Sequence, residues 1–439
     1  MALKMTKFGG SSVADANQFR KVKAIVEADP SRQFVVPSAP GKRFPGDDKI
    51  TDLLYLTYAQ FTGGVEEYEE TFARIAERYL TIEKELGLNT NISAELDGIL
   101  RNLELGVSED YIVSRGEYLC ALLLADYLGF EFCDASELIC FHADGTYDDE
   151  TTQRWTAPLE RERKLVIPGF YGRRRDGSIK TFSRGGSDIT GAIIARAVHA
   201  DVYENWTDVS GFMMADPRIV KDPKIIRTVS YSELRELAYM GASVLHEDSI
   251  FPVRKAKIPI NVRNTNKPDE PGTLIVPDEY IRYYPREGIL TGVTGRKGFT
   301  VINVYKDNMH NETGFGYRLL RVLDRYQISF EHVPSGIDSM SVVVADTNLR
   351  GQLELVLRDI RNDCQPGRID LKSGLALVTA VGNGMIGSRG TAARLFTALE
   401  KAEINVVLID QASSEMNIIV GIEEADFEKA IGAIYHAFE

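Results

Sequence analysis

The chain has 439 residues and carries 51 lysines and arginines against 64 aspartates and glutamates, a formal net charge of −13. This length predicts two or three domains, and the acidic balance argues against nucleic acid or an anionic membrane as the main partner. Four cysteines without a CxxC pair indicate neither a disulfide framework nor a zinc knuckle, so we assign no metal ligands.

Targeting signals are not apparent in the sequence. No apolar run approaches the roughly 20 residues of a membrane span, and the start "MALKMTKF" lacks the apolar core of a signal peptide. We therefore expect a cytoplasmic protein whose partners are small molecules.

The first motif is a glycine turn, "MTKFGGSSVAD" at residues 5–15. Its glycine pair follows a predicted strand, so main-chain N–H groups could approach an anion, and Lys7 could reach the same charge. The alternative is a tight turn in which Ser11 or Ser12 caps the next helix. The Walker spacing is absent. The turn alone leaves both interpretations open.

Up to about residue 285, short β-rich runs alternate with amphipathic helical stretches, which predicts one layered α/β domain over residues 1–285. One predicted helix, "SEDYIVSRGEYLCALLLADYLG", places Glu117 on an apolar stripe. A carboxylate there is costly unless it is paired or binds a cation or an ammonium group. Glu117 is therefore a candidate binding residue for a cation or an ammonium group.

A second glycine turn lies in "KTFSRGGSDITGAIIARAVHADVYENW", residues 180–206, which reads as a strand, a turn, a helix and another strand. Its main-chain donors and Arg184 suit a carboxylate or a phosphate. The alternative makes Ser187 or Asp188 a helix cap. Two glycines beside an arginine favour the binding site.

The next loop, "WTDVSGFMMADPRIV" at 206–220, holds Asp208, Asp216 and Arg218. Loops at the carboxyl ends of strands form the ligand crevice of α/β sheets, so we expect this loop to face both glycine turns. The alternative is a solvated polar loop.

After a proline-rich linker at 265–286, the sequence repeats with an offset of 76, which aligns Met309 with Met385 and Gly314 with Gly390. Each copy reads as a ferredoxin-like βαββαβ module, with "ISFEHVP" as one strand. The second copy lacks a strand, and 288–295 is a spare one. We predict that the first module, about 297–372, is inserted in the second, about 286–296 plus 373–439.

One motif in this half favours a different function. "GNGMIG" at 382–387 follows an apolar run and precedes a helix, as in a dinucleotide-binding turn, which would indicate a nicotinamide-linked oxidoreductase. The matching loop of the first copy lacks those glycines, and too little chain follows for a dinucleotide fold. We therefore disfavour this alternative.

Together, residues 7–13, the run 183–188, Trp206-Thr207-Asp208 and the tandem modules resemble the aspartokinases over nearly the whole chain. The resemblance implies an amino-acid-kinase fold, a layered α/β/α sheet, followed by two ferredoxin-like ACT modules. It implies transfer of the γ-phosphoryl of ATP, with Mg²⁺, to the side-chain carboxylate of L-aspartate. That reaction begins the synthesis of lysine, threonine and methionine.

The resemblance also assigns residues. The catalytic set is Lys7, Gly9, Gly10 and Asp188. The aspartate-binding set is Ser38, Thr51, Glu117, Arg184 and Ser187. The nucleotide-binding set is Lys7, Gly10, Ser11, Thr207, Asp208 and Arg218.

The sequence departs from the family pattern at several positions. Ser11 stands where threonine is usual, and Met213 and Ser243 stand where some members have a tyrosine and a lysine near ATP. Extra residues separate Ser38 from Thr51, and their purpose is not evident from the sequence.

Two other functions remain open. A kinase acting on glutamate or acetylglutamate would share the fold, and a non-catalytic amino-acid sensor could be built on ACT modules. Ferredoxin-like modules expose sheet edges that commonly pair, so we expect a homodimer or a higher homo-oligomer through the ACT modules.

The two copies differ at Glu331, which corresponds to Val407 in the second copy. A glutamate beside a glycine-bearing loop could pair with the side-chain ammonium of a ligand while the loop binds its α-carboxylate, which fits lysine better than threonine. We expect feedback inhibition by lysine through Met309, Gly314, Phe315 and Glu331. The alternative is an exposed glutamate on an edge strand.

Overall fold

The computed structural model describes residues 2–183, 185–241, 247–285 and 288–439. The chain forms two compact units. The first comprises Met1–Phe212, Ile225–Ser232 and Ser243–Tyr284, and the second comprises Met213–Lys224, Glu233–Ala242 and Pro285–Glu439. The long continuous part of the second unit begins at the boundary expected near residue 285, but two earlier segments also belong to it.

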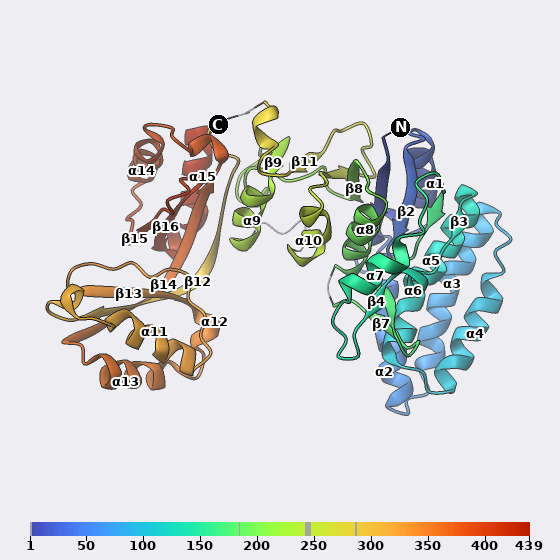
Figure 1. The fold of residues 1–439 in the computed structure, drawn as a ribbon, viewed down its shortest axis with the longest axis horizontal. Helices are drawn as coiled ribbons and strands as arrows, with labels where there is room; N and C mark the ends of the chain where they lie inside the picture. The colour runs from blue at the N-terminus through green and yellow to red at the C-terminus, as the bar shows by residue number, and fades with distance from the viewer. Residues whose placement is uncertain (1, 184, 242–246, 286–287) are drawn as a thin grey trace. The chain divides into compact units, whose positions relative to one another are not determined.

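The first unit is built on an eight-stranded sheet with the order β3-β5-β2-β1-β8-β10-β11-β9 (Figure 1). Its neighbouring strands are parallel except for the antiparallel pair β10 and β11. The carboxyl ends of the central strands β2, β1, β8 and β10 therefore meet at one edge. A separate sheet has the order β4-β6-β7. The strands are β1 (Lys4–Phe8), β2 (Arg32–Pro37), β3 (Glu131–Phe132), β4 (Cys140–Phe141), β5 (Leu165–Val166), β6 (Tyr171–Arg174), β7 (Ile179–Thr181), β8 (Val202–Thr207), β9 (Thr228–Ser230), β10 (Ile260–Asn264) and β11 (Thr273–Val276).

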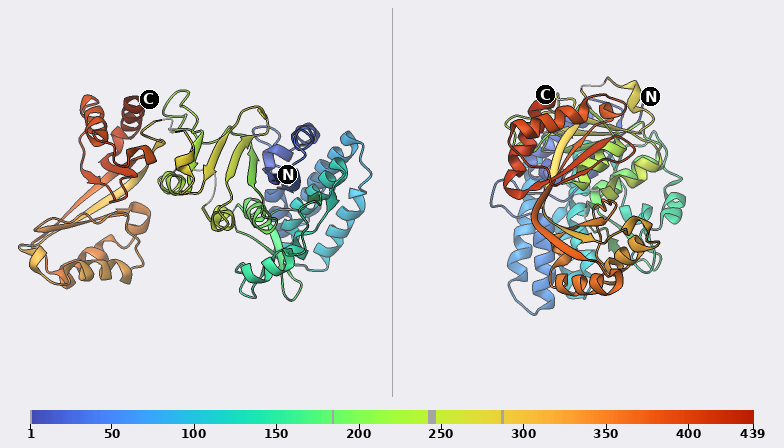
Figure 2. Two further views of the ribbon diagram at one scale, coloured as in Figure 1. Left: turned by 45° about the horizontal axis from the view of Figure 1, so that its top comes forward. Right: turned by 90° about the vertical axis from the view of Figure 1, so that its left-hand side faces the viewer.

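Helices cover both faces of the large sheet, which gives the expected α/β/α layers (Figures 1 and 2). Apolar residues of α1 to α5 form one core with Phe8, Val35 and Trp206. On the opposite face α8 packs against β1, β2 and β8. The helices are η1 (Gly10–Val13), α1 (Ala16–Glu27), α2 (Ile50–Thr62), α3 (Tyr68–Leu86), α4 (Ile92–Glu104), α5 (Glu109–Leu128), α6 (Ala135–Leu138), α7 (Asp149–Thr156), α8 (Gly186–Ala197), α10 (Glu247–Lys255) and η2 (Ile281–Tyr283), with α9 (Tyr231–Tyr239) passing from this unit into the second.

The structure rules out one alternative interpretation and corrects one expected pairing of strands. Helix α1 is capped by Asp15, whose carboxylate accepts from the Gln18 N–H, and not by Ser11 or Ser12, which lie in the preceding turn η1. Strands β7 and β8, which flank the second glycine turn, belong to different sheets, so they do not form one βαβ unit. Strand β7 instead pairs with β6 as a hairpin.

The second unit contains a five-stranded antiparallel sheet with the order β13-β12-β14-β16-β15. The first part of β12 pairs with the end of β14 beside β16, and its second part pairs with β13 and the start of β14. The spare segment thus supplies a strand to the second copy. The elements are β12 (Gly292–Tyr305), η3 (Met309–Asn311), α11 (Phe315–Arg325), β13 (Ser339–Ala345), α12 (Asp346–Leu349), α13 (Leu353–Cys364), β14 (Arg368–Val381), η4 (Asn383–Met385), α14 (Thr391–Lys401), β15 (Leu408–Asp410), β16 (Asn417–Glu423), η5 (Glu424–Asp426) and α15 (Phe427–Phe438).

The strand expected at "ISFEHVP" is reduced to isolated bridges, His332 to Val343 and Ser335 to Met340. Pro334 has no N–H to donate, so regular pairing with β13 is interrupted there. The "GNGMIG" segment forms η4 between β14 and α14 of an antiparallel sheet, which is not the parallel βαβ arrangement of a dinucleotide fold.

In the described part of the chain, no helix has both the length and the apolar character that a bilayer span requires.

Candidate active site

The side chain of Lys7 marks the centre of the candidate site. It lies at the end of β1, is 7% exposed, and its Nζ is 2.7 Å from Oδ1 of Asp188 in the first turn of α8. The same carboxylate oxygen accepts a hydrogen bond from Nδ2 of Asn205 at 2.9 Å. Lys7 and Asn205 are register partners on the parallel strands β1 and β8, so both side chains leave the same face of the sheet.

The glycine turn follows directly from β1. The Gly9 N–H donates to the Trp206 carbonyl at 2.9 Å, so it is occupied in the sheet and is not available to a phosphate. Gly10 then opens the helical turn η1. The first N–H groups of such a turn have no partner within it, so those of Gly10 and Ser11 are the donors suited to an anion beside the Lys7 ammonium.

The second glycine turn leads into α8, whose N-cap is Gly185, with a left-handed φ of 64° and no side-chain cap. Ser187 and Asp188 lie inside the first turn, so neither is the helix cap. A Cβ on Gly169 would lie 2.6 Å from the Ser187 Cβ, and the Gly169 N–H donates to the Pro37 carbonyl at 3.2 Å. Ser187 is thereby placed at the end of β2. Arg184 lies outside the described residues.

Glu117 is a buried carboxylate on α5, only 4% exposed. It accepts a hydrogen bond from the Ala39 main chain, while its Oε2 has no hydrogen-bond partner among the described residues. Burial raises the pKa of Glu117 to about 8, against the opposing effects of the Ala39 hydrogen bond and the Lys7 charge. A buried oxygen without a partner costs free energy until a proton or a cationic ligand satisfies it.

Ser38 and Thr51 border the same strand ends. The Ser38 N–H donates to the Phe8 carbonyl at 2.9 Å, so Ser38 extends β2 beside the glycine turn. Thr51 is the second residue of α2 and is half-buried. The Ile50 N–H donates to the Pro40 carbonyl at 3.1 Å, which keeps the start of α2 close to the end of β2.

The residues assigned to the nucleotide are divided between the two units. Thr207 ends β8, and its hydroxyl donates to the exposed Asp208 at 3.2 Å. Arg218 belongs to the second unit, where its side chain is 87% exposed and pairs with Asp216. Arg218 and the strand ends described above therefore belong to different compact units, and the assignment of Arg218 to the nucleotide stays a prediction. Met213 is also in the second unit, and Ser243 lies outside the described residues.

In the second unit, the side chains of Met309 and Phe315 are buried in the core of the first module. Only their main chains, together with Gly314, the N-cap of α11 at φ 80°, remain for a ligand. Glu331 is half-buried and accepts a hydrogen bond from the Tyr239 hydroxyl. Burial and the Glu331 carboxylate raise the pKa of Tyr239 to about 12.

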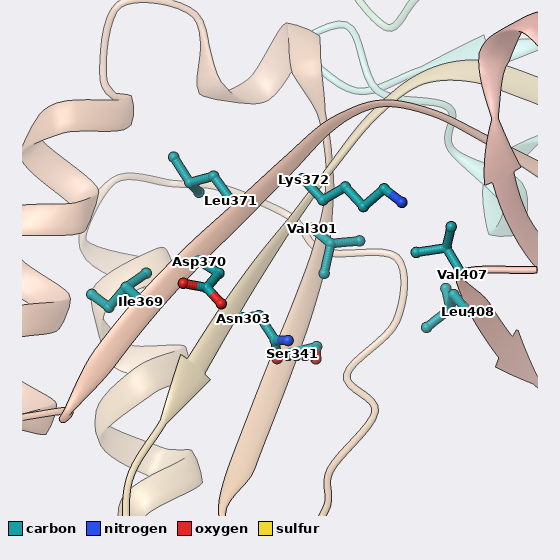
Figure 3. Close-up of a pocket in the computed structure, with 9 residues that line it drawn as sticks. All are labelled: Val301, Asn303, Ser341, Ile369, Asp370, Leu371, Lys372, Val407 and Leu408. Atoms are coloured by element: carbon teal, nitrogen blue, oxygen red, sulfur yellow. Dashed lines mark hydrogen bonds between the residues drawn. The ribbon is translucent and has the colours of Figure 1, made fainter.

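A recess of about 680 Å³ lies on the sheet of the second unit (Figure 3). None of the four residues expected to bind the effector lines it. Its polar side chains already have partners: Asn303 bonds Ser341, Asp370 pairs with Arg368, and Lys372 pairs with Glu423. In the described part of the chain, the polar side chains that line the recess therefore do not demand a ligand.

Residues 3–264 match the model of the amino acid kinase family, and residues 378–438 match an ACT domain model. The chain is 37% identical to Aspartokinase 3 of Bacillus subtilis, over 99% of this chain and 98% of that protein. This chain belongs to the aspartokinase family. Aspartokinases are phosphotransferases, and both parts of such an enzyme, kinase and ACT, are present here.

Solved aspartokinase structures agree with the fold. The crystal structure of Clostridium acetobutylicum aspartate kinase covers 100% of both chains at 48% identity, with a TM-score of 0.88. E. coli aspartokinase III has been solved with aspartate and ADP (26% identity, TM-score 0.73) and with lysine and aspartate (27% identity, TM-score 0.72), each covering 99% of both chains.

Three residues of this aspartokinase site were missed from the sequence. Asn205 directly precedes the Trp206-Thr207-Asp208 motif, and its position opposite Lys7 could have been found from the pairing of β1 with β8. No local sequence motif includes Gly41 or Arg78. They join the site only through contacts between segments far apart in the sequence.

Proposed function

We propose that this enzyme transfers the γ-phosphoryl of ATP to the side-chain carboxylate of L-aspartate at the site around Lys7 and Asp188. The products are 4-phospho-L-aspartate and ADP, and the step opens lysine, threonine and methionine synthesis. The observation that carries the proposal is the Lys7–Asp188 ion pair, 2.7 Å long, beside the Gly9-Gly10 turn. The complex of E. coli aspartokinase III with aspartate and ADP supports it.

The chemistry needs alignment more than proton transfer. The aspartate side chain is already ionised at neutral pH, so one carboxylate oxygen forms the bond to the γ-phosphorus without a base. The bond from that phosphorus to the bridging oxygen breaks, and ADP leaves with the electron pair. Lys7 neutralises charge on the phosphoryl oxygens, and Asp188, itself held by Asn205, fixes the Lys7 ammonium.

ATP fits the residues present. The N–H groups of Gly10 and Ser11 at the start of η1, with the Lys7 ammonium, suit its phosphates, and Thr207 and Asp208 follow the neighbouring strand. Arg218 remains in the proposed nucleotide set on the family resemblance alone. Mg²⁺ would be held largely by the ATP phosphates and water, and it would neutralise phosphate charge when bound.

Aspartate recognition is proposed for Glu117, Ser38, Thr51, Ser187 and Arg184. The unpartnered oxygen of Glu117 suits the substrate ammonium, which would keep the buried carboxylate ionised. Arg184 is assigned the α-carboxylate, and the three hydroxyls seat the rest of the molecule. The acceptor carboxylate is then directed toward Lys7.

A coupled assay tests the acceptor. ADP release is measured with ATP and each of L-aspartate, L-glutamate and N-acetyl-L-glutamate in turn. We expect turnover with aspartate. Turnover with one of the other acids and none with aspartate would assign a different amino-acid kinase, and no ATP-dependent turnover with any acid would favour a sensor.

Regulation and assembly are further parts of the proposal. Lysine inhibits through Glu331 and the loop that carries Met309, Gly314 and Phe315, in a homodimer formed through the ACT modules, in the cytoplasm. The complex of E. coli aspartokinase III with lysine and aspartate supports the choice of effector. The module boundaries proposed from the sequence, 297–372 within 286–296 plus 373–439, fit the pairing of β12 with β14.

A further inference from the structure

The loop between Ser38 and Thr51 had no evident role in the sequence, but the structure shows how it is held. Its tip, residues 42–46, is exposed, whereas Gly41 and Asp47 are buried. Its base is closed by the hydrogen bond from the Ile50 N–H to the Pro40 carbonyl. The loop is therefore anchored inside the protein at Gly41 and at Asp47, on either side of its exposed tip.

Asp47 organises the outer half of the loop. Its Oδ2 accepts from the main-chain N–H and from Nε of Arg43, both at 2.9 Å, and its Oδ1 accepts from Nη2 of Arg43 at 3.0 Å. These hydrogen bonds hold the pKa of the Asp47 carboxyl well below its usual range. The loop thus contains a buried carboxylate whose ionised form is favoured by its arginine partners.

Arg78 of α3, 5% exposed, reaches this carboxylate from outside the loop. Its Nη2 donates to Oδ2 of Asp47 at 2.8 Å, and its Nη1 donates to the Gly41 carbonyl at 2.9 Å and to the Ala14 carbonyl at 3.3 Å. One guanidinium therefore joins both buried points of the loop to the residue that follows η1.

Gly41 passes this constraint to the glycine turn. Its N–H donates to the Gly10 carbonyl at 2.8 Å. A Cβ on Gly41 would lie 2.7 Å from the Gly10 carbonyl carbon, and a Cβ on Gly10 would lie 2.8 Å from the Ala39 carbonyl oxygen. The two backbones are in contact without intervening side chains, so a shift of Gly41 moves Gly10.

We infer that Arg78 is a positioning residue for phosphoryl transfer, because it fixes Gly41 against Gly10 and so aims the N–H groups of η1 at the phosphates of ATP. The inference rests on the proposed function. A planar guanidinium presents donors in fixed directions to three acceptors, whereas the single ammonium of lysine is a point charge. Arg78 acts through the backbone and touches no substrate.

The test is Arg78→Lys in the full-length enzyme, with kcat and the KM for ATP and for aspartate measured separately. We expect kcat/KM for ATP to fall about 10- to 100-fold, the order of loss that about 1 Å of misplacement produces. The KM for aspartate should stay within about twofold, because none of the hydrogen bonds described for Arg78 reaches Ser38 or Glu117. Calorimetric titration with ADP should show a matching loss of affinity.

Arg74→Lys is the matched control. Arg74 lies one turn earlier on α3, is exposed, and pairs with Asp48 near the end of the same loop. It has no contact with Gly41, so its variant should keep wild-type values for both substrates and for ADP.

Asp47→Asn provides a second variant, which decides the matter if Arg78→Lys does not fold. An amide oxygen cannot replace both carboxylate oxygens, so we expect the same preferential loss toward ATP and ADP. Wild-type values for ADP affinity and for kcat/KM of ATP in the folded variant, or equal losses for both substrates with ADP binding unchanged, would overturn the inference. Absence of aspartate-dependent turnover in the wild type would instead refute the proposed function.

Discussion

Nζ of Lys7 lies 2.7 Å from Oδ1 of Asp188, and the pair joins the end of β1 to the first turn of α8. Lys7 precedes the first glycine turn and Asp188 follows the second, so the ion pair brings the starts of η1 and α8 together beside the ammonium. Asn205 completes the arrangement from β8. Most of the predictions below test this cluster or the groups that it faces.

Lys7→Ala should reduce kcat by about 10²- to 10³-fold, the typical loss for one preorganised group that stabilises transition-state charge. The melting temperature should change little, because the ammonium faces the site and is not part of an apolar core. Steady-state kinetics and thermal unfolding by circular dichroism give both values. Lys4→Ala is the control: Lys4 is on the same strand and pairs with Asp29. Equal kcat in the two variants would remove Lys7 from the mechanism.

Asn205→Ala should lower kcat about tenfold and leave the KM for aspartate nearly unchanged. Asp188 then loses a neutral hydrogen bond worth about 1 kcal/mol, and the Lys7 ammonium is less well fixed. Kinetics with both substrates measure this. A variant with unchanged kcat would show that the ion pair needs no third group.

The pH dependence of kcat/KM for aspartate should follow Glu117. Its pKa of about 8 means that the free enzyme holds this carboxyl protonated at lower pH, and only the ionised form attracts the substrate ammonium. We expect kcat/KM to rise with pH through about 8. The Glu117→Gln variant should have a lower kcat/KM for aspartate at every pH and should lack this rise.

The same group links stability to pH. The pKa of Glu117 is raised on folding from 4.5 to about 8, so the folded state binds the extra proton and loses stability as pH rises across that interval. Unfolding by urea from pH 5 to pH 9 should show a decline in the wild type that is smaller in Glu117→Gln. Parallel curves for the two proteins would mean that the carboxyl is ionised throughout.

Glu331→Gln should relieve lysine inhibition and leave uninhibited turnover near normal. The side-chain ammonium of lysine loses its carboxylate partner, while the kinase site is unaffected. Inhibition curves with lysine and with threonine measure the effect. Unchanged sensitivity to lysine, or inhibition by threonine alone, would place the effector elsewhere.

Tyr239→Phe should make inhibition more sensitive to lysine, by a factor of about 3 to 10. The Tyr239 hydroxyl donates to Glu331, so a ligand ammonium must displace it. Removing the hydroxyl removes that competition. A reduced sensitivity would show instead that this hydrogen bond belongs to the inhibited state.

Features carried by short sequence patterns could be predicted. The glycine turns, the helix that carries Glu117 and the repeat of the ACT modules each depend on neighbouring residues or a fixed offset, and all are present in the structure. Local patterns do not specify which strand a given strand pairs with. The strand character of residues 179–181 was predicted, but not its pairing with β6 in a separate sheet.

The contacts that hold the site together were beyond sequence reasoning for the same reason. Arg78 is one of two arginines on the amphipathic helix α3, and nothing in the pattern shows that it and not the exposed Arg74 contacts the loop around Gly41. Its role arises only when α3 places the guanidinium between two carbonyls and Asp47. Glu331 likewise acquires its Tyr239 partner from a segment far upstream.

The segments 213–224 and 233–242 bear on how chimeric enzymes should be built. Ala215 and Val220 pack in a core with Val293 and Phe427, and the buried Glu233 accepts hydrogen bonds from Thr291 and from the Asn383 main chain. A kinase fragment cut at residue 285 would keep both segments but lose the surfaces that cover them. Apolar side chains would be exposed, and the Glu233 carboxylate would lose its partners Thr291 and Asn383. A regulatory half exchanged between two enzymes must therefore carry its own 213–224 and 233–242, as a three-piece graft and not as a C-terminal cassette.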